Sequence, residues 1–174
     1  MKLRWIAAVA ALAASSASMA QDFCAHRDTN SLVWNKAFAA EVKRYFGGSK
    51  GYLYWDKATI ASQVLAGLGG PPDAIRRLDG NMAIASACRA HSCMEKAAVV
   101  IACPATIVAI GAIHYSPTSG EGWTDRPELT LFSDGSNQQA HDALKQWAAA
   151  ALGDKFDGMP VHVRSPLQTS SRKR

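Results

Sequence analysis

The sequence has 174 residues, of which 48% are hydrophobic, and it carries a formal net charge of +5. A chain of this length forms one domain with its own hydrophobic core, and the lack of a sequence repeat argues against solenoids and propellers. The positive excess lies at the two ends, because residues 21–157 hold 13 basic and 14 acidic side chains. A nucleic-acid-binding surface is therefore not expected.

Residues 1–20 have the pattern of a secretory signal peptide. Lys2 and Arg4 precede an apolar run from Trp5 to Ala14, and small residues follow this run. We expect cleavage before Gln21 and an exported, periplasmic product. No later stretch reaches the roughly 18 apolar residues that a membrane span requires.

The first helix is predicted over Ser31–Phe46, ended by Gly47-Gly48. Its apolar side chains recur at helical spacing and form one stripe, which is typical of core contact. The stripe consists of Trp34, Phe38, Val42 and Tyr45. The candidate caps at its start are Thr29, Asn30 and Ser31.

An aromatic cluster follows at Gly51–Asp56, which is interpreted as core packing or as a lid over a sheet rather than as a ligand platform. A second, short helix is predicted over Ala58–Leu68. Gly69-Gly70 and Pro71-Pro72 end it, because proline cannot continue a helix.

Short runs of apolar and β-branched residues, separated by turn residues, predict about five strands. Asp79-Gly80 is typical of a hairpin turn between the first two. The connections are too short for crossover helices, so the sheet is predicted to be antiparallel. The strands are expected at Ala74–Leu78, Asn81–Ala87, Ala97–Cys103, Thr106–Tyr115 and Glu128–Phe132.

A last helix is predicted over Asn137–Leu152, with a capping box made by Ser136 and Gln139. Val161–Val163 could add a small edge strand. The predicted fold class is α+β: one domain over residues 21–163, whose antiparallel sheet is flanked by helices. Residues 164–174 are expected to form a basic, disordered tail.

Four cysteines remain after the predicted cleavage, and export permits disulfides. Three pairings are conceivable for four cysteines. Proximity in the sequence favours Cys88 with Cys93, which leaves Cys24 with Cys103. The second bridge would connect the N-terminus of the mature chain to the end of a strand.

The stretch Cys88-Arg89-Ala90-His91-Ser92-Cys93 lies between two predicted strands, so it is expected to form the disulfide-closed tip of a hairpin. A metal site made by Cys88, His91 and Cys93 is a weaker alternative, because three ligands in so small a ring cannot easily surround a tetrahedral ion. The sequence contains no GxSxG, phosphate-loop, HExxH or CxxC motif. We therefore expect neither an enzyme nor a cofactor-binding protein.

Cys-Arg-Ala-His-Ser-Cys between two apolar strands resembles the loop of the Ivy family, the exported bacterial inhibitors of vertebrate lysozyme. Family members carry Cys-Lys-Pro-His-Asp-Cys at this place, in a domain of similar size. The resemblance implies a five-stranded antiparallel sheet with flanking helices and a protruding loop that enters the cleft of C-type lysozyme. It also implies that His91 hydrogen-bonds the catalytic carboxyls of the enzyme.

The resemblance assigns the loop residues their roles. A retaining glycosidase holds two carboxyl groups about 5 Å apart, and the two nitrogens of one imidazole can bridge such a pair. Arg89 keeps the positive charge of the family lysine, which favours an anionic cleft. Ala90 replaces the family proline and loosens the free loop by about 0.4 to 1 kcal/mol. Ser92 replaces an aspartate, and both departures predict weaker inhibition.

Two other functions could use the same Cys88–Cys93 loop. A divergent relative could restrain the lytic transglycosylases of its own cell, or could have lost lysozyme inhibition, because transglycosylases also place an acidic residue in a cleft. A metal or thiol module formed by the cysteines and His91 is the third and weakest hypothesis. The sequence is compatible with a monomer or a homodimer.

Overall fold

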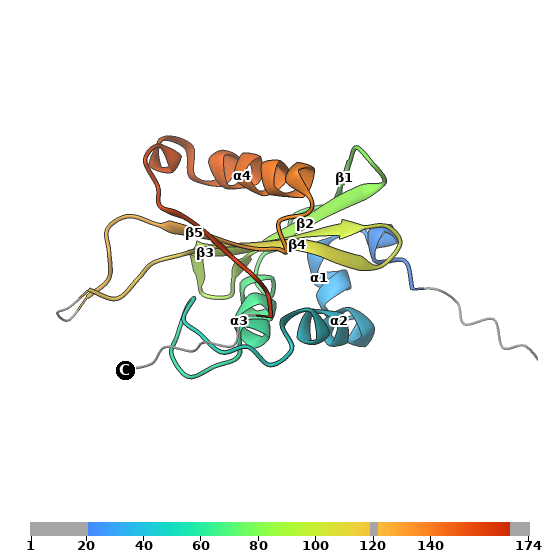
Figure 1. Cartoon of the computed structure of the whole chain (residues 1–174), viewed down its shortest axis with the longest axis horizontal. Coiled ribbons are helices and arrows are strands. Elements are labelled where there is room, and N and C mark those ends of the chain that lie inside the picture. The colour runs from blue at the N-terminus through green and yellow to red at the C-terminus, as the bar shows by residue number, and fades with distance from the viewer. Residues whose placement is uncertain (1–20, 119–121, 168–174) are drawn as a thin grey trace, which may run out of the picture.

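A six-stranded sheet separates two helical layers in the computed structural model, which describes residues 21–118 and 122–167 (Figure 1). The helices that precede the sheet in the chain lie on one of its faces, and the last α-helix lies on the other. This arrangement confirms the predicted α+β class. The α-helices are α1 (Thr29–Val33), α2 (Lys36–Phe46), α3 (Ile60–Gly67) and α4 (Gln138–Leu152), and Phe23–Ala25 and Gly153–Phe156 form short 3-10 helices.

The strand order follows the chain from β1 to β6. Strands β1 to β5 pair antiparallel, as predicted from their short connections. The last strand, β6, instead pairs parallel with β5, because the connection between them contains α4 and is long enough for a crossover. The strands are β1 (Arg76–Leu78), β2 (Met82–Arg89), β3 (Ser92–Ala102), β4 (Thr106–His114), β5 (Glu128–Phe132) and β6 (Val161–Arg164).

The helix predicted over Ser31–Phe46 is in fact two helices, which is a correction to the sequence analysis. Asn35 interrupts it, because its side chain accepts a hydrogen bond from the Ala37 backbone N–H and caps α2. Trp34 thereby leaves the predicted apolar stripe and is 79% exposed.

Two predicted helix caps were also wrong by one position. Asp28, rather than one of the three residues after it, caps α1 and forms a capping box with Ser31. Asn137 caps α4 by accepting from the Ala140 N–H, where Ser136 was expected. In both cases an Asx side chain stands next to the predicted Ser or Thr, and both types are favoured caps.

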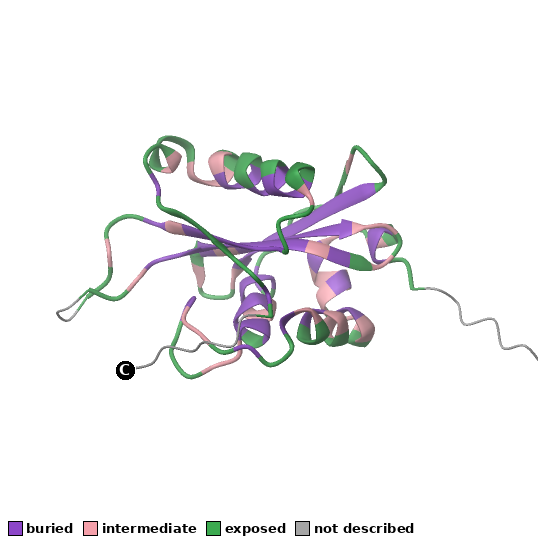
Figure 2. Cartoon of the chain, viewed as in Figure 1, coloured by how far each residue is buried: buried purple, intermediate pink, exposed green. Residues whose placement is uncertain are grey.

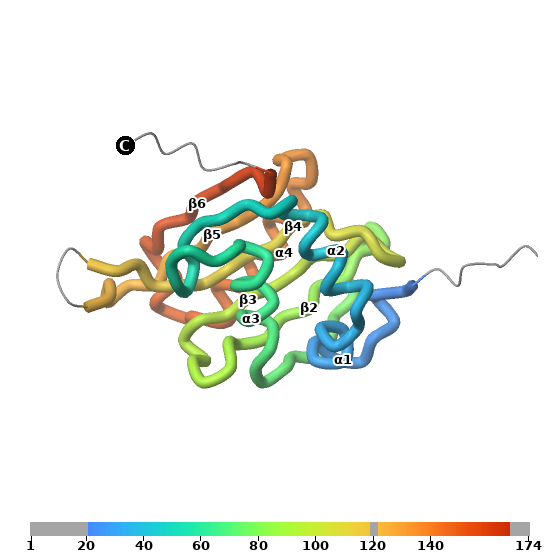
Figure 3. The backbone as a smooth tube through the Cα atoms, turned by 90° about the horizontal axis from the view of Figure 1, so that it is seen from below, coloured from blue at the N-terminus to red at the C-terminus, as the bar shows by residue number. Residues whose placement is uncertain are grey.

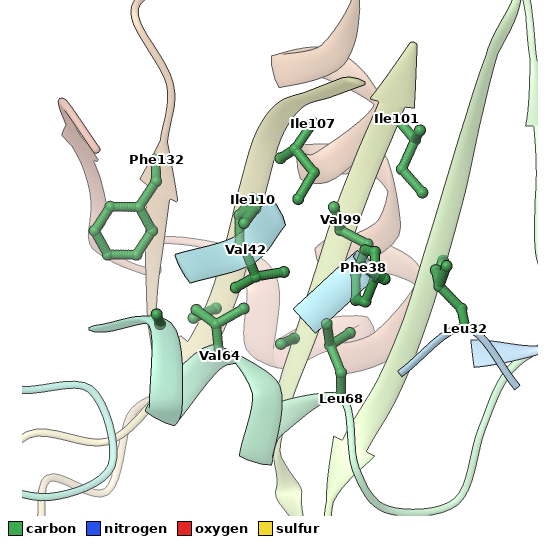
Figure 4. Close-up of a cluster of buried hydrophobic side chains, with 14 of the residues drawn as sticks. Leu32, Phe38, Val42, Val64, Leu68, Val99, Ile101, Ile107, Ile110 and Phe132 are labelled. Carbon is green, nitrogen blue, oxygen red and sulfur yellow. The ribbon is translucent and has the colours of Figure 1, made fainter. Parts of the chain in front are cut away.

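The core between the sheet and helices α1 to α3 is shown in Figure 4, where apolar side chains from both layers point toward one another. Strand residues at alternate positions face this layer, since side chains alternate across a strand. Figure 2 shows the sheet buried along most of its length, whereas the outer faces of the helices are exposed. The labelled core residues are Leu32, Phe38, Val42, Val64, Leu68, Val99, Ile101, Ile107, Ile110 and Phe132.

The opposite face of the sheet is covered by α4. Leu144 and Trp147 pack there over Gly111 of β4, and a Cβ on this glycine would come within 3.2 Å of Leu144 and 3.4 Å of Trp147. A glycine inside a strand marks either a bulge or a close packing contact. Close helix packing is the reason for it.

Both predicted disulfides are present. Cys24 bonds to Cys103 with a Cα–Cα distance of 5.8 Å, and Cys88 bonds to Cys93. Beside the first bridge, the Phe23 N–H donates to the Pro104 carbonyl at 2.8 Å. The N-terminal segment is therefore attached to the turn between β3 and β4. No helix in the described part of the chain is long and apolar enough to cross a membrane.

The C-terminal boundary differs from the prediction. Arg164 was expected to begin the disordered tail, but it is the last residue of β6 and pairs with Phe132. The Ser49 hydroxyl then donates to the Pro166 carbonyl at 3.0 Å, so the chain is held to the α2 side of the sheet. The predicted signal peptide and residues 168–174 of the predicted tail lie outside the described residues.

Candidate functional site

The Cys88–Cys93 loop forms the turn between β2 and β3, as the sequence predicted. Ala90 and His91 are the turn residues, and Arg89 pairs with Ser92 across them. His91 has a φ of 65°, in the left-handed region that histidine occupies more readily than most residues. His91 is exposed at the end of the hairpin.

The disulfide closes this turn beside an irregularity in the sheet. Cys88 and Cys93 have a Cα–Cα distance of 4.7 Å. Cys88 pairs with Lys96 in the sheet register, so residues 93–95 have no counterpart on β2 and bulge from β3. A bulge changes the direction of the side chains it contains. One of them, Glu95, is turned inward and is only 8% exposed.

Arg89 is paired within the protein. Its Nε donates to Glu95 Oε2 at 2.5 Å, and a second guanidinium nitrogen also contacts this carboxylate. The guanidinium carbon lies 5.7 Å from the ring centre of Tyr54 and 5.9 Å from that of Trp55. The resemblance to the Ivy family gives Arg89 the role of a supporting charge toward an enzyme. In the folded protein this charge is already shared with Glu95 and two aromatic rings.

The aromatic segment under Arg89 is held by a residue that the sequence analysis did not single out. Gln63 of α3 is fully buried, and its Oε1 accepts the backbone N–H groups of Leu53, Tyr54 and Trp55 at 3.0, 2.8 and 3.2 Å. Its Nε2 donates to the Gly51 carbonyl at 2.7 Å. A polar residue inside an apolar helix face is the only sequence signal that could have indicated this role.

The same segment supports the neighbouring loop between β4 and β5. The Tyr52 ring stacks on Trp123 with 6.1 Å between ring centres, and its hydroxyl donates to the Tyr115 carbonyl at 3.2 Å. Burial and the nearby Glu95 carboxylate raise the pKa of Tyr52 to about 12. Since the start of β3 lies beside the end of β4, both loops lie at the same end of the sheet (Figure 3).

The base of the Cys88–Cys93 loop packs against the connection that follows α3. The Gly70 N–H donates to the Cys88 carbonyl at 2.9 Å. A Cβ on Gly70 would lie only 2.3 Å from that carbonyl oxygen and 2.8 Å from the Ala90 nitrogen. Only glycine allows this approach.

The described residues offer little for metal or thiol chemistry. No group of three or more His, Cys, Asp or Glu side chains among them could hold a metal ion. All four cysteines are in disulfides.

The loop thus combines an exposed imidazole, a covalent ring and a partly buried ion pair at one end of the sheet. Comparison of the chain with family models, with curated proteins and with solved structures found no match.

Proposed function

We propose that the protein is an exported inhibitor of C-type lysozyme, which inserts the Cys88–Cys93 loop into the active-site cleft of the enzyme. The observation that carries the proposal is the exposed imidazole of His91 at the tip of a hairpin closed by a disulfide. The resemblance of the loop sequence to that of the Ivy family supports the choice of target.

The chemistry of the target explains why an imidazole suits it. Lysozyme hydrolyses a glycosidic bond between two carboxyl groups, one protonated and one ionised. A histidine side chain has a nitrogen on each side of its ring, so it can hydrogen-bond both carboxyl groups at once. His91 would occupy the place of the scissile bond without offering a bond to cleave.

The rigidity of the loop supports tight binding. Ordering a flexible loop on association costs free energy, and a loop that is already held in its bound shape avoids much of this cost. The Cys88–Cys93 bridge closes the loop, and the bonds from Glu95 and Gly70 hold its base. Export fits the two disulfides, which persist in oxidising compartments.

The first prediction tests His91. His91→Ala should raise the Kd for a vertebrate C-type lysozyme by about 30-fold or more, because truncating a hydrogen-bonded group at an interface costs about 2 kcal/mol or more. The measurement is calorimetric titration together with cell-wall lysis at increasing inhibitor. His162→Ala is the matched control, since His162 of β6 is also exposed.

Equal affinity of His91→Ala and the parent for lysozyme would contradict the proposal. The same titrations with a lytic transglycosylase examine the second target class. Binding to that enzyme with none to lysozyme would overturn the proposal in favour of autolysis control. Circular dichroism and thermal unfolding should be the same for His91→Ala and the parent, because His91 is exposed.

A further inference from the structure

Glu95 is a buried carboxylate next to the proposed contact residue. It is 8% exposed and lies in the bulge of β3, between Cys93 and the first regularly paired residue, Lys96. Burying a charge is costly unless it is paired. Its ion-pair partner is Arg89, so the two ends of the hairpin turn are joined by a charge-assisted pair as well as by the disulfide.

Arg89 carries this connection further, to a separate element of the fold. Its guanidinium lies over the rings of Tyr54 and Trp55. The Tyr54 ring is fixed in turn, because its hydroxyl donates to the Lys96 carbonyl at 2.8 Å and its backbone N–H donates to Gln63. The loop is thus connected through Arg89 to α3.

The disulfide alone does not set the direction of the loop. It closes the ring between Cys88 and Cys93, but residues 93–95 have no counterpart in the backbone pairing of β2 with β3. The contacts from Glu95 to Arg89, and from Arg89 to the aromatic rings, join the side chains of this bulge to the body of the domain in addition to the disulfide. We call Glu95, Arg89, Tyr54 and Trp55 the clamp.

We propose that Glu95 and Arg89 are positioning residues, which hold the Cys88–Cys93 loop in its binding orientation before it meets the enzyme. This inference rests on the proposed function for its binding partner. Arg89 then acts through Glu95 and the aromatic rings rather than as a free charge that attracts an anionic cleft.

The two roles of Arg89 predict opposite effects for Glu95→Gln. If Arg89 were a free attracting charge, removing the nearby negative charge would accelerate association and strengthen binding. If the pair positions the loop, the same change releases the loop, and the dissociation rate rises while the association rate changes little. Arg89→Lys separates the roles again, because lysine keeps the charge but lacks the planar, bidentate group.

The test is surface-based kinetic measurement of binding to immobilised C-type lysozyme at low and high salt. Glu95→Gln and Arg89→Lys should each raise the dissociation rate about three- to tenfold, as expected for a partly exposed charge-assisted pair. Glu41→Gln is the matched control. It removes a similar ion pair, that of Glu41 with Arg44 on α2, away from the loop.

A second measurement needs no enzyme. In the free protein, amide hydrogen exchange at residues 90–95 should be faster in Glu95→Gln than in the parent or in Glu41→Gln, with unchanged exchange in the core strands. If the Glu95–Arg89 pair only stabilised the whole fold, its loss in Glu95→Gln would lower the protection of all strands together.

The outcomes separate the two proposals. Faster exchange in the loop with a raised dissociation rate supports the clamp. Unchanged loop exchange, or tighter binding of Glu95→Gln, overturns it even if lysozyme inhibition is demonstrated. A parent protein that does not bind lysozyme overturns the proposed function, whereas the exchange result still decides whether the clamp orders the loop.

Discussion

His114 is a buried histidine at the end of β4. Its Nε2 lies 2.9 Å from the Thr130 hydroxyl of β5, and its Nδ1 has no hydrogen-bond partner among the described residues. Burial and a contact with the neighbouring strand are typical of a structural histidine. Burial lowers its pKa to about 4, although the nearby Glu128 carboxylate acts in the opposite direction.

This lowered pKa predicts a loss of stability in acid. The unfolded histidine titrates near pH 6.5, so between about pH 6.5 and 4 the unfolded state binds more protons than the folded state. The free energy of unfolding should therefore fall as the pH drops through this window, by up to about 3 kcal/mol from this group. Above pH 6.5 the contribution of His114 to the free energy of unfolding is complete.

Urea unfolding at pH 7 and at about pH 4 measures the effect. His114→Gln keeps a hydrogen-bonding side chain but cannot be protonated, so it should lose less stability than the parent between these pH values. His91→Gln, a change at the exposed histidine of the hairpin tip, is the control and should keep the pH dependence of the parent. An unaltered pH dependence in His114→Gln would assign the loss of stability to other groups.

At the scale of elements, the connection between α3 and β1 packs against the base of the hairpin loop and supports it. Gly70 contacts the Cys88 backbone, and the Asp73 N–H donates to the Ser86 carbonyl at 2.9 Å. From the sequence, Gly69-Gly70 is expected only to end a helix. Its second role depends on β2 lying beside it.

Gly70→Ala should displace the base of the loop, because the atoms that the new Cβ would meet belong to the backbone. We expect the free energy of unfolding to fall by about 1 to 3 kcal/mol, as for other overpacked sites, and lysozyme binding to weaken. Urea unfolding and calorimetric titration measure the two effects. Gly69→Ala is the neighbouring control, since its Cβ would come no closer than 3.3 Å to another atom. An equal loss of stability and of lysozyme binding in Gly70→Ala and Gly69→Ala would show that the close contact at Gly70 does not support the loop.

At the scale of the whole molecule, the Cys24–Cys103 bridge and the hairpin loop are independent. The bridge spans a sequence separation of 79 residues and attaches the N-terminal segment to the turn after β3. The proposed binding loop lies at the opposite end of β3. Stability and inhibition are therefore expected to respond separately to changes at the two disulfides.

The double substitution Cys24→Ser with Cys103→Ser should lower the free energy of unfolding by about 4 kcal/mol, since it releases a long closed segment of the unfolded chain. Inhibition of lysozyme should persist under all conditions in which the variant is still folded. Denaturant unfolding and cell-wall lysis assays measure both. Loss of inhibition in a variant shown to be folded would contradict this independence.

Local patterns in the chain were sufficient for much of this description. Alternating and β-branched residues located the strands, Asp79-Gly80 located a turn, and cysteine spacing located the hairpin loop that carries His91. These features depend on neighbours within a few positions, whose backbone preferences are visible in the sequence. At the starts of α1 and α4, the same preferences favour two neighbouring residues equally as the cap. The predicted cap was wrong at both helices.

The surroundings of the loop were decided by contacts between distant parts of the chain. Nothing in the local sequence indicates that Arg89 meets Trp55, that Gln63 binds the aromatic segment, or that Gly70 lies on β2. The parallel pairing of β6 likewise depends on how α4 crosses the sheet. Such contacts arise only when the sheet and helices pack, because burial then requires each polar group to find a partner across the fold.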